Sequence, residues 1–105
     1  MEAAGWVKRL YERTNNLEAN AKGDLEKLQI KQQRLLLSDI CVFPELLLEI
    51  PIEKEGALTV VISKFAQELG KAEERKDETL NERRTQYALQ IATYLLFSNA
   101  PLTFA

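Results

Sequence analysis

The residues that decide the fold run from Leu58 to Phe97 and read LTVVISKFAQELGKAEERKDETLNERRTQYALQIATYLLF. Apolar side chains recur in this stretch every three or four residues, which is the spacing of one face of an α-helix. No proline interrupts the stretch, and its polar middle, 73–84, consists largely of good helix formers. We therefore expect one long amphipathic helix over about 58–98. Its apolar face comprises Leu58, Val61, Ile62, Phe65, Leu69, Ala72, Leu80, Tyr87, Ile91, Tyr94 and Leu95.

A second stripe of apolar side chains precedes this stretch and predicts another long helix over about 2–37. Gly23 and the asparagines Asn15, Asn16 and Asn20 lower the helix propensity near its centre, so a kink or a break is expected there. The stripe comprises Ala3, Val7, Leu10, Thr14, Leu17, Ala21, Leu28 and Leu35.

Both predicted helices are apolar at their ends and polar in the middle. Folding the chain back on itself places 3–11 beside 87–97 and 25–40 beside 58–69, so that apolar ends meet and polar middles meet. A parallel arrangement would need a much longer connection. The sequence therefore predicts a single all-α domain over 1–105, an antiparallel helical hairpin of two long amphipathic helices.

The connector, 38–57, allows two interpretations. Pro44 and Pro51 bracket an apolar segment that fits a short helix starting at the first proline. The alternative is an α+β fold with a β-hairpin at 46–63, because apolar residues alternate there and several are β-branched. We favour the all-helical interpretation because the stripe that begins at Leu58 continues without a break. The tail, 99–105, is expected to be extended after Pro101.

The composition excludes several classes of function. The chain has 105 residues, a net charge of −2 with the two signs interspersed, and no histidine. It therefore lacks the clustered basic surface of a nucleic-acid-binding protein and the ligands of most zinc sites. No phosphate-binding or nucleophile motif is present, so we expect no enzymatic activity, no cofactor, no metal and no small-molecule substrate.

The single cysteine and the hydropathy bear on the cellular compartment. Cys41 cannot form an internal disulfide, the first residues lack the features of a secretory signal, and the longest apolar run covers only 87–97. We expect a cytoplasmic, reducing location and no membrane span. Because the neighbours of Cys41 are apolar, we expect its thiol to be buried. The aromatic residues Trp6, Tyr11, Tyr87 and Tyr94 are expected to pack together where the helix ends meet.

The chain has more large apolar side chains than the single seam of a two-helix hairpin can bury. They are covered either by the connector and tail folding over the hairpin or by a protein partner, and we favour the partner. The expected function is a non-enzymatic protein–protein interaction module, a small helical subunit or adaptor in a homo- or hetero-oligomer. The alternative is a small chaperone or inhibitor that shields an apolar segment of a client protein. The candidate contact residues are Leu46, Leu47, Leu48, Ile50, Leu95, Leu96, Phe97 and Phe104.

Overall fold

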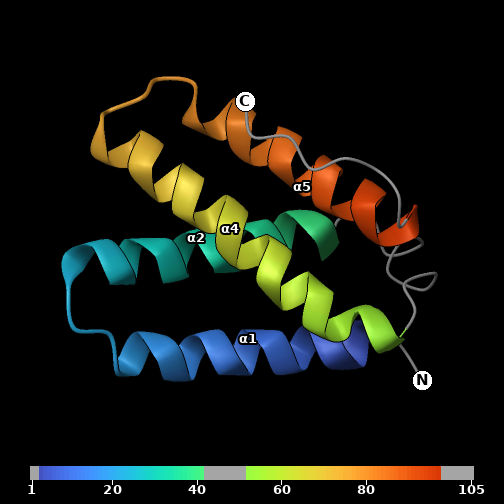
Figure 1. Ribbon diagram of the computed structural model, residues 1–105. Coiled ribbons are helices and arrows are strands. Elements are labelled where there is room, and N and C mark those ends of the chain that lie inside the picture. Colours follow the sequence, from blue (N-terminus) through green and yellow to red (C-terminus); the bar gives the residue numbers. More distant parts are fainter. Residues whose placement is uncertain (1–2, 42–51, 98–105) are drawn as a thin grey trace.

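The computed structural model describes residues 3–41 and 52–97, and all secondary structure in that part of the chain is helical (Figure 1). This confirms the predicted all-α class for the described residues. The β-hairpin alternative is wrong in its described part, since residues 55–63 are helical. The elements are α1 (Ala3–Ala19), α2 (Asp24–Cys41), the 3₁₀ turn η1 (Ile52–Lys54), α4 (Glu55–Glu74) and α5 (Leu80–Leu96).

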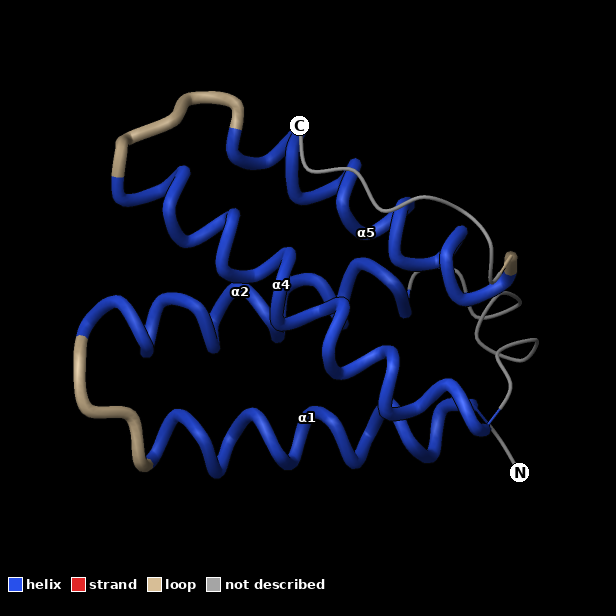
Figure 2. Tube along the Cα trace, in the orientation of Figure 1, coloured by secondary structure: helices blue, strands red, loops and turns tan. Residues whose placement is uncertain are grey.

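The two continuous long helices of the prediction are not confirmed, because a turn divides each of them (Figure 2). The first turn lies at 20–23. Asn20 and Gly23 belong to the residues whose low helix propensity predicted a kink or a break in this helix. The Asn20 amide donates to the Leu17 carbonyl at 3.2 Å and closes the end of α1. The Gly23 carbonyl accepts from the Lys27 amide at 3.0 Å, which starts α2. Glu26 then satisfies the free Lys22 amide through its carboxylate at 3.1 Å.

The second turn, at 75–79, has no counterpart in the sequence-based expectation. α4 ends in a pair of backbone hydrogen bonds, from the Lys76 amide to the Glu73 carbonyl and from the Asp77 amide to the Ala72 carbonyl, both 2.9 Å. This pair defines a Schellman motif, which requires a left-handed residue just after the helix. Lys76 occupies that position with φ 58°. The chain thereby leaves the helix axis, and α5 begins at Leu80.

The four α-helices of the described part form two antiparallel hairpins, α1 with α2 and α4 with α5 (Figure 1). α2 packs against α1, α4 and α5, and α4 also packs against α5. The predicted proximity of 25–40 to 58–69 is thus observed as the packing of α2 on α4. The predicted pairing of 3–11 with 87–97 is wrong. The main contact of α1 is with α2, because the turn at 20–23 folds α1 back onto α2.

A single buried cluster joins the helices, and Phe65 of α4 stacks on Tyr87 of α5 at its centre with ring centroids 4.8 Å apart. The radius of gyration is 13.3 Å, which is about the value for a compact domain of this length. The turns at 20–23 and 75–79 therefore give a more compact shape than two uninterrupted long helices would have. The largest fully buried members of the cluster are Leu36, Leu37, Ile40, Leu58, Phe65, Leu69, Tyr87, Ile91 and Leu95.

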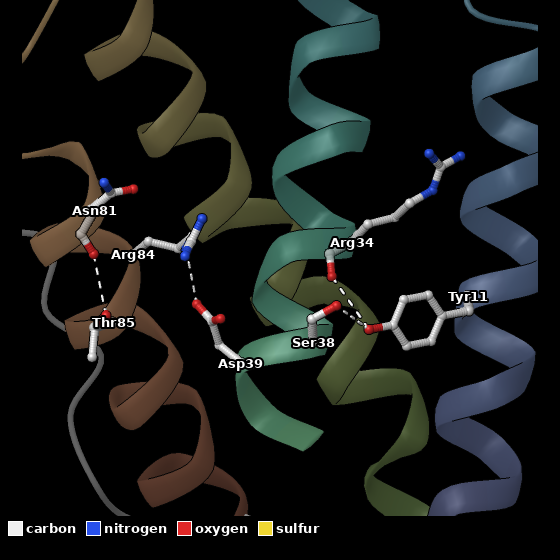
Figure 3. Close-up of polar contacts among 7 residues, drawn as sticks. All are labelled: Tyr11, Arg34, Ser38, Asp39, Asn81, Arg84 and Thr85. Atoms are coloured by element: carbon white, nitrogen blue, oxygen red, sulfur yellow. Dashed lines mark hydrogen bonds and ion pairs between the residues drawn. The ribbon is translucent and has the colours of Figure 1, made fainter. Parts of the chain in front are cut away.

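Polar contacts fasten the outer helices to α2 (Figure 3). The hydroxyl groups of Tyr11 in α1 and Ser38 in α2 lie 2.6 Å apart. Arg84 of α5 donates to the Asp39 carboxylate of α2 at 2.9 Å. At the other end of α5, the Lys54 ammonium donates to the Leu95 carbonyl at 3.1 Å and so satisfies one of the free carbonyls of the last turn. The contacts of Tyr11 and Arg84 thus help to fix α1 and α5 on α2, and the Lys54 contact ties the end of α5 to the start of α4.

Candidate protein-binding groove

A surface groove lies between α1 and α4 and has α2 at its floor. It consists of two adjoining depressions that share Leu10, Arg13 and Thr59. The first has a volume of about 60 Å³ and is lined by Leu10, Arg13, Thr14, Leu17, Gln33, Leu37, Thr59, Ile62 and Ser63. The second lies at the start of α4 and is lined by Arg9, Leu10, Arg13, Gly56 and Thr59.

The groove follows from the way the helices cross. α1 lies alongside α2, whereas α4 crosses α2 at an angle, so α1 and α4 diverge along the surface of α2 (Figures 1 and 2). On α4 the groove is lined by Gly56, Thr59 and Ser63, which are three or four residues apart and share one face. Gly56 has no side chain and those of Thr59 and Ser63 are small, so space remains between the two helices above Ile62, the other α4 residue that lines the groove.

The floor of the groove is apolar. Leu10, Leu37 and Ile62 form its base and belong to the buried core. Leu17, which lies two helical turns beyond Leu10 on α1, is 43% exposed. Other exposed apolar side chains, such as Leu89 on α5, do not line this groove. Scattered exposed apolar residues are normal on a soluble protein. In the groove an exposed leucine adjoins a concave surface with an apolar base, and Leu25 likewise lines a depression between the start of α2 and the end of α4.

The charged residues that line the groove are all cationic among the described residues. Arg9 and Arg13, one helical turn apart on α1, are its only ionisable residues. Arg13 is exposed and has no ion-pair partner in the described part of the chain. The opposite rim, on α4, carries the hydroxyl groups of Thr59 and Ser63. The groove therefore has a basic edge and a neutral edge in a chain whose net charge is −2.

The contact residues predicted from the sequence fall into three groups. Leu95 is fully buried in the core and offers no surface to a partner in this structure. Leu96 is half-buried and Phe97 is 62% exposed, both at the end of α5. The others, Leu46, Leu47, Leu48, Ile50 and Phe104, lie outside the described residues. The sequence analysis missed the groove, although the small residues at 56, 59 and 63 were a usable signal.

Cys41 is exposed at the last residue of α2, so the prediction that it is buried is wrong. Partial desolvation of its sulfur nevertheless raises the pKa of the thiol, which keeps it protonated and poorly reactive. Desolvation likewise raises the pKa of Tyr11, although its hydrogen bond to Ser38 acts in the opposite direction. Residues 3–41 and 52–97 contain no group of three or more cysteine, aspartate or glutamate side chains suited to hold a metal ion.

The predicted aromatic cluster is only partly described. Tyr87 packs on Phe65 in the core, whereas the Tyr11 hydroxyl contacts Ser38 on another helix. Tyr94 packs against the core, with the Lys54 ammonium 5.9 Å from the centroid of its ring. The aromatic residues whose side chains are described therefore have structural contacts and do not form a ligand cage.

No helix in the described ranges combines the length and the hydropathy needed to cross a membrane. Comparison of the chain with protein-family models, with curated proteins and with solved structures finds no match.

Proposed function

We propose that this protein is a non-enzymatic protein–protein interaction module, a small helical subunit or adaptor that seats a helix of its partner between α1 and α4. One observation carries the proposal: Leu17 is 43% exposed beside a concave surface whose base is apolar. Burying such a surface stabilises an association through the hydrophobic effect.

The dimensions of the groove favour a helical partner. Its α1 edge extends from Arg9 to Leu17, which at 1.5 Å per residue is about 12 Å, or roughly two turns of a helix. Such a length accommodates apolar side chains at positions i, i+3 or i+4, and i+7. The described part of the chain contains no strand whose edge could pair with an extended peptide. Helix-against-helix packing is therefore the mode that this surface supports.

Leu96 and Phe97 extend the proposed contact surface at the same end of the molecule. Lys54 joins the last turn of α5 to the start of α4, and Gly56 of the groove follows two residues later. A partner helix longer than two turns would leave the groove near this end. We therefore retain these two residues as secondary contacts.

Site-specific photocrosslinking in cells of the source organism tests the proposal. A photoreactive phenylalanine analogue replaces Leu17 or Thr59 in the groove, and the matched control carries it at Leu89 on α5, which is exposed and outside the groove. We expect both groove positions to capture the same protein and the control position not to capture it. Capture of one protein supports a subunit or adaptor, and capture of a second copy supports a homo-oligomer.

Two results would count against the adaptor function. If the analogue at Leu89 cross-links as strongly as at the groove positions, the interaction lies elsewhere on the protein. If folded groove variants capture no protein, the proposal is refuted. Capture of many unrelated proteins by both groove positions would replace it with the alternative, a chaperone that shields apolar segments.

A further inference from the structure

We propose that the exposed face of α2 is the surface through which two copies of this chain associate, with their α2 helices antiparallel about a two-fold axis. The inference does not depend on the proposed function, because none of the residues involved lines the groove between α1 and α4. Its basis is an exposed stripe of leucine, aspartate and lysine that is complementary to itself in one orientation only.

The stripe has the residue spacing of a coiled-coil seam. It consists of Asp24, Leu28, Lys31 and Leu35. Steps of four, three and four residues place these side chains on one face of α2. Asp24 and Lys31 are exposed, and Leu28 is half-buried. Leu35 is 39% exposed, and Leu25, which lies beside the stripe, is 45% exposed. The face therefore offers a partner three leucines with accessible surface.

The two ends of the stripe carry opposite charges. At the start of α2, a depression of about 200 Å³ is lined by Asp24, Leu25, Leu28, Glu73 and Glu74. The amide of Gln32 donates to one oxygen of Glu73 at 2.6 Å, so the carboxylates free for a partner are those of Asp24 and Glu74. Farther along the stripe is the ammonium of Lys31. Asp24, Glu74 and Lys31 form no ion pair with a described residue, so binding has none to break.

This charge pattern selects the antiparallel orientation. In a parallel pair, Asp24 would face Asp24 of the other copy and Lys31 would face Lys31, and like charges repel. In an antiparallel pair with the two-fold axis between Leu28 and Lys31, Lys31 of each copy lies opposite Leu28 of the other. The aliphatic stem of the lysine then covers the leucine, and its ammonium is about 6 Å, one helical turn, from Asp24. Symmetry forms this contact twice.

A second copy of the chain supplies what the depression lacks. The depression has carboxylates and exposed leucine but no cationic lining residue. Its occupant must therefore combine a cation with apolar surface, and Lys31 and Leu35, one turn apart on the same stripe, do so. The contact is limited to a few turns of one helix, so the association should be weak and concentration-dependent.

Sedimentation equilibrium of the full chain at about 5–500 µM tests the inference. We expect a monomer–dimer equilibrium that shifts toward monomer as salt is raised. Lys31→Glu and Asp24→Lys each place like charges at both contacts, so each variant alone should dimerise at least about tenfold more weakly than the parent protein. An equimolar mixture of the two variants restores opposite charges at both contacts and should dimerise to within about threefold of the parent protein.

Two matched controls separate this surface from the rest of the molecule. Lys64→Glu reverses an exposed charge on α4 that does not line the depression, and should change dimerisation by less than about threefold. Leu35→Asp should weaken dimerisation at least about tenfold, whereas Val60→Asp, at a residue 55% exposed on α4, should not. Circular dichroism of each variant establishes that the fold is retained.

Three results would overturn the inference. They are a chain that stays monomeric over the whole concentration range, a dimer of unchanged strength in folded Lys31→Glu, and a mixture of the two charge variants that associates no better than either variant alone. None of these results decides the proposed function, which depends on cross-linking at the groove.

Discussion

Replacing Lys76 with glycine should stabilise the protein, because this residue closes α4 in a conformation that a side chain disfavours. Lys76 has φ 58°, and the left-handed region costs a residue with a Cβ roughly 1–2 kcal/mol. Its side chain is exposed and forms no ion pair with a described residue, so its removal breaks no contact. Glycine removes the steric cost but makes the unfolded chain more flexible, which subtracts about 0.4–1 kcal/mol.

The difference between these two terms is a gain of roughly 0–1.6 kcal/mol in the free energy of unfolding, with a central value of about 0.8 kcal/mol. For a domain of this size the gain corresponds to a rise in Tm of roughly 3–6 °C. Urea denaturation followed by circular dichroism measures the first quantity, and a thermal scan measures the second. The two Schellman hydrogen bonds at Glu73 and Ala72 remain possible, so the slope of the urea transition should not change.

Two controls isolate the backbone effect. Lys76→Ala removes the long side chain but keeps the Cβ, and should change the stability by less than about 0.5 kcal/mol. Lys71→Gly places the same substitution inside the last turn of α4, where glycine should cost about 1 kcal/mol. The reasoning is refuted if Lys76→Gly is no more stable than the parent protein, or if Lys76→Ala gains as much as Lys76→Gly.

The remaining predictions concern the core and the turn before α5. Leu36→Ala should lower the free energy of unfolding by about 2–5 kcal/mol, because Leu36 is fully buried. Leu35→Ala, at the half-exposed neighbour, should lower it by less than about 1 kcal/mol. Similar losses for the two variants in chemical denaturation would contradict the packing of α2. Asp77 accepts hydrogen bonds from the Thr79 hydroxyl (2.7 Å) and amide (2.9 Å), which hold the pKa of its carboxyl below the ordinary value of 3.8. Because the Asp77 carboxyl has a lower pKa in the folded state than in the unfolded state, its ionised form stabilises the protein at pH values above the unfolded-state pKa. The difference in stability between the parent protein and Asp77→Ala should therefore be complete at about pH 7 and should shrink as the pH falls below 3.8. Urea titrations at about pH 7 and about pH 2 measure this difference, and an advantage that is independent of pH would show that ionisation of Asp77 does not contribute.

The helical class could be predicted because the stripes of apolar residues are long and regular. The buried residues of α4 and α5, such as Phe65, Leu69 and Ile91, are the ones that the helical spacing indicates. Gly23 also marked the first turn correctly, since glycine is a poor helix former. These features depend on local sequence, which a single chain displays directly.

The remaining features depend on information that local sequence does not carry. Lysine has no preference for the left-handed region, so Lys76 gave no signal that α4 ends there. The compact shape depends on helices with more than one buried side, as in α2, where the adjacent residues Leu36 and Leu37 are both fully buried. The groove depends on the angle at which α4 crosses α2, which is set by packing across the whole bundle.

The central position of α2 has a consequence for how the protein tolerates change. α2 packs against three helices, so a new side chain on its buried surface has to fit several neighbours at once. α1 has α2 as its main neighbour and should accept substitutions more readily, including those that reshape its rim of the groove. Sequence variation should therefore accumulate on α1 while α2 preserves the architecture.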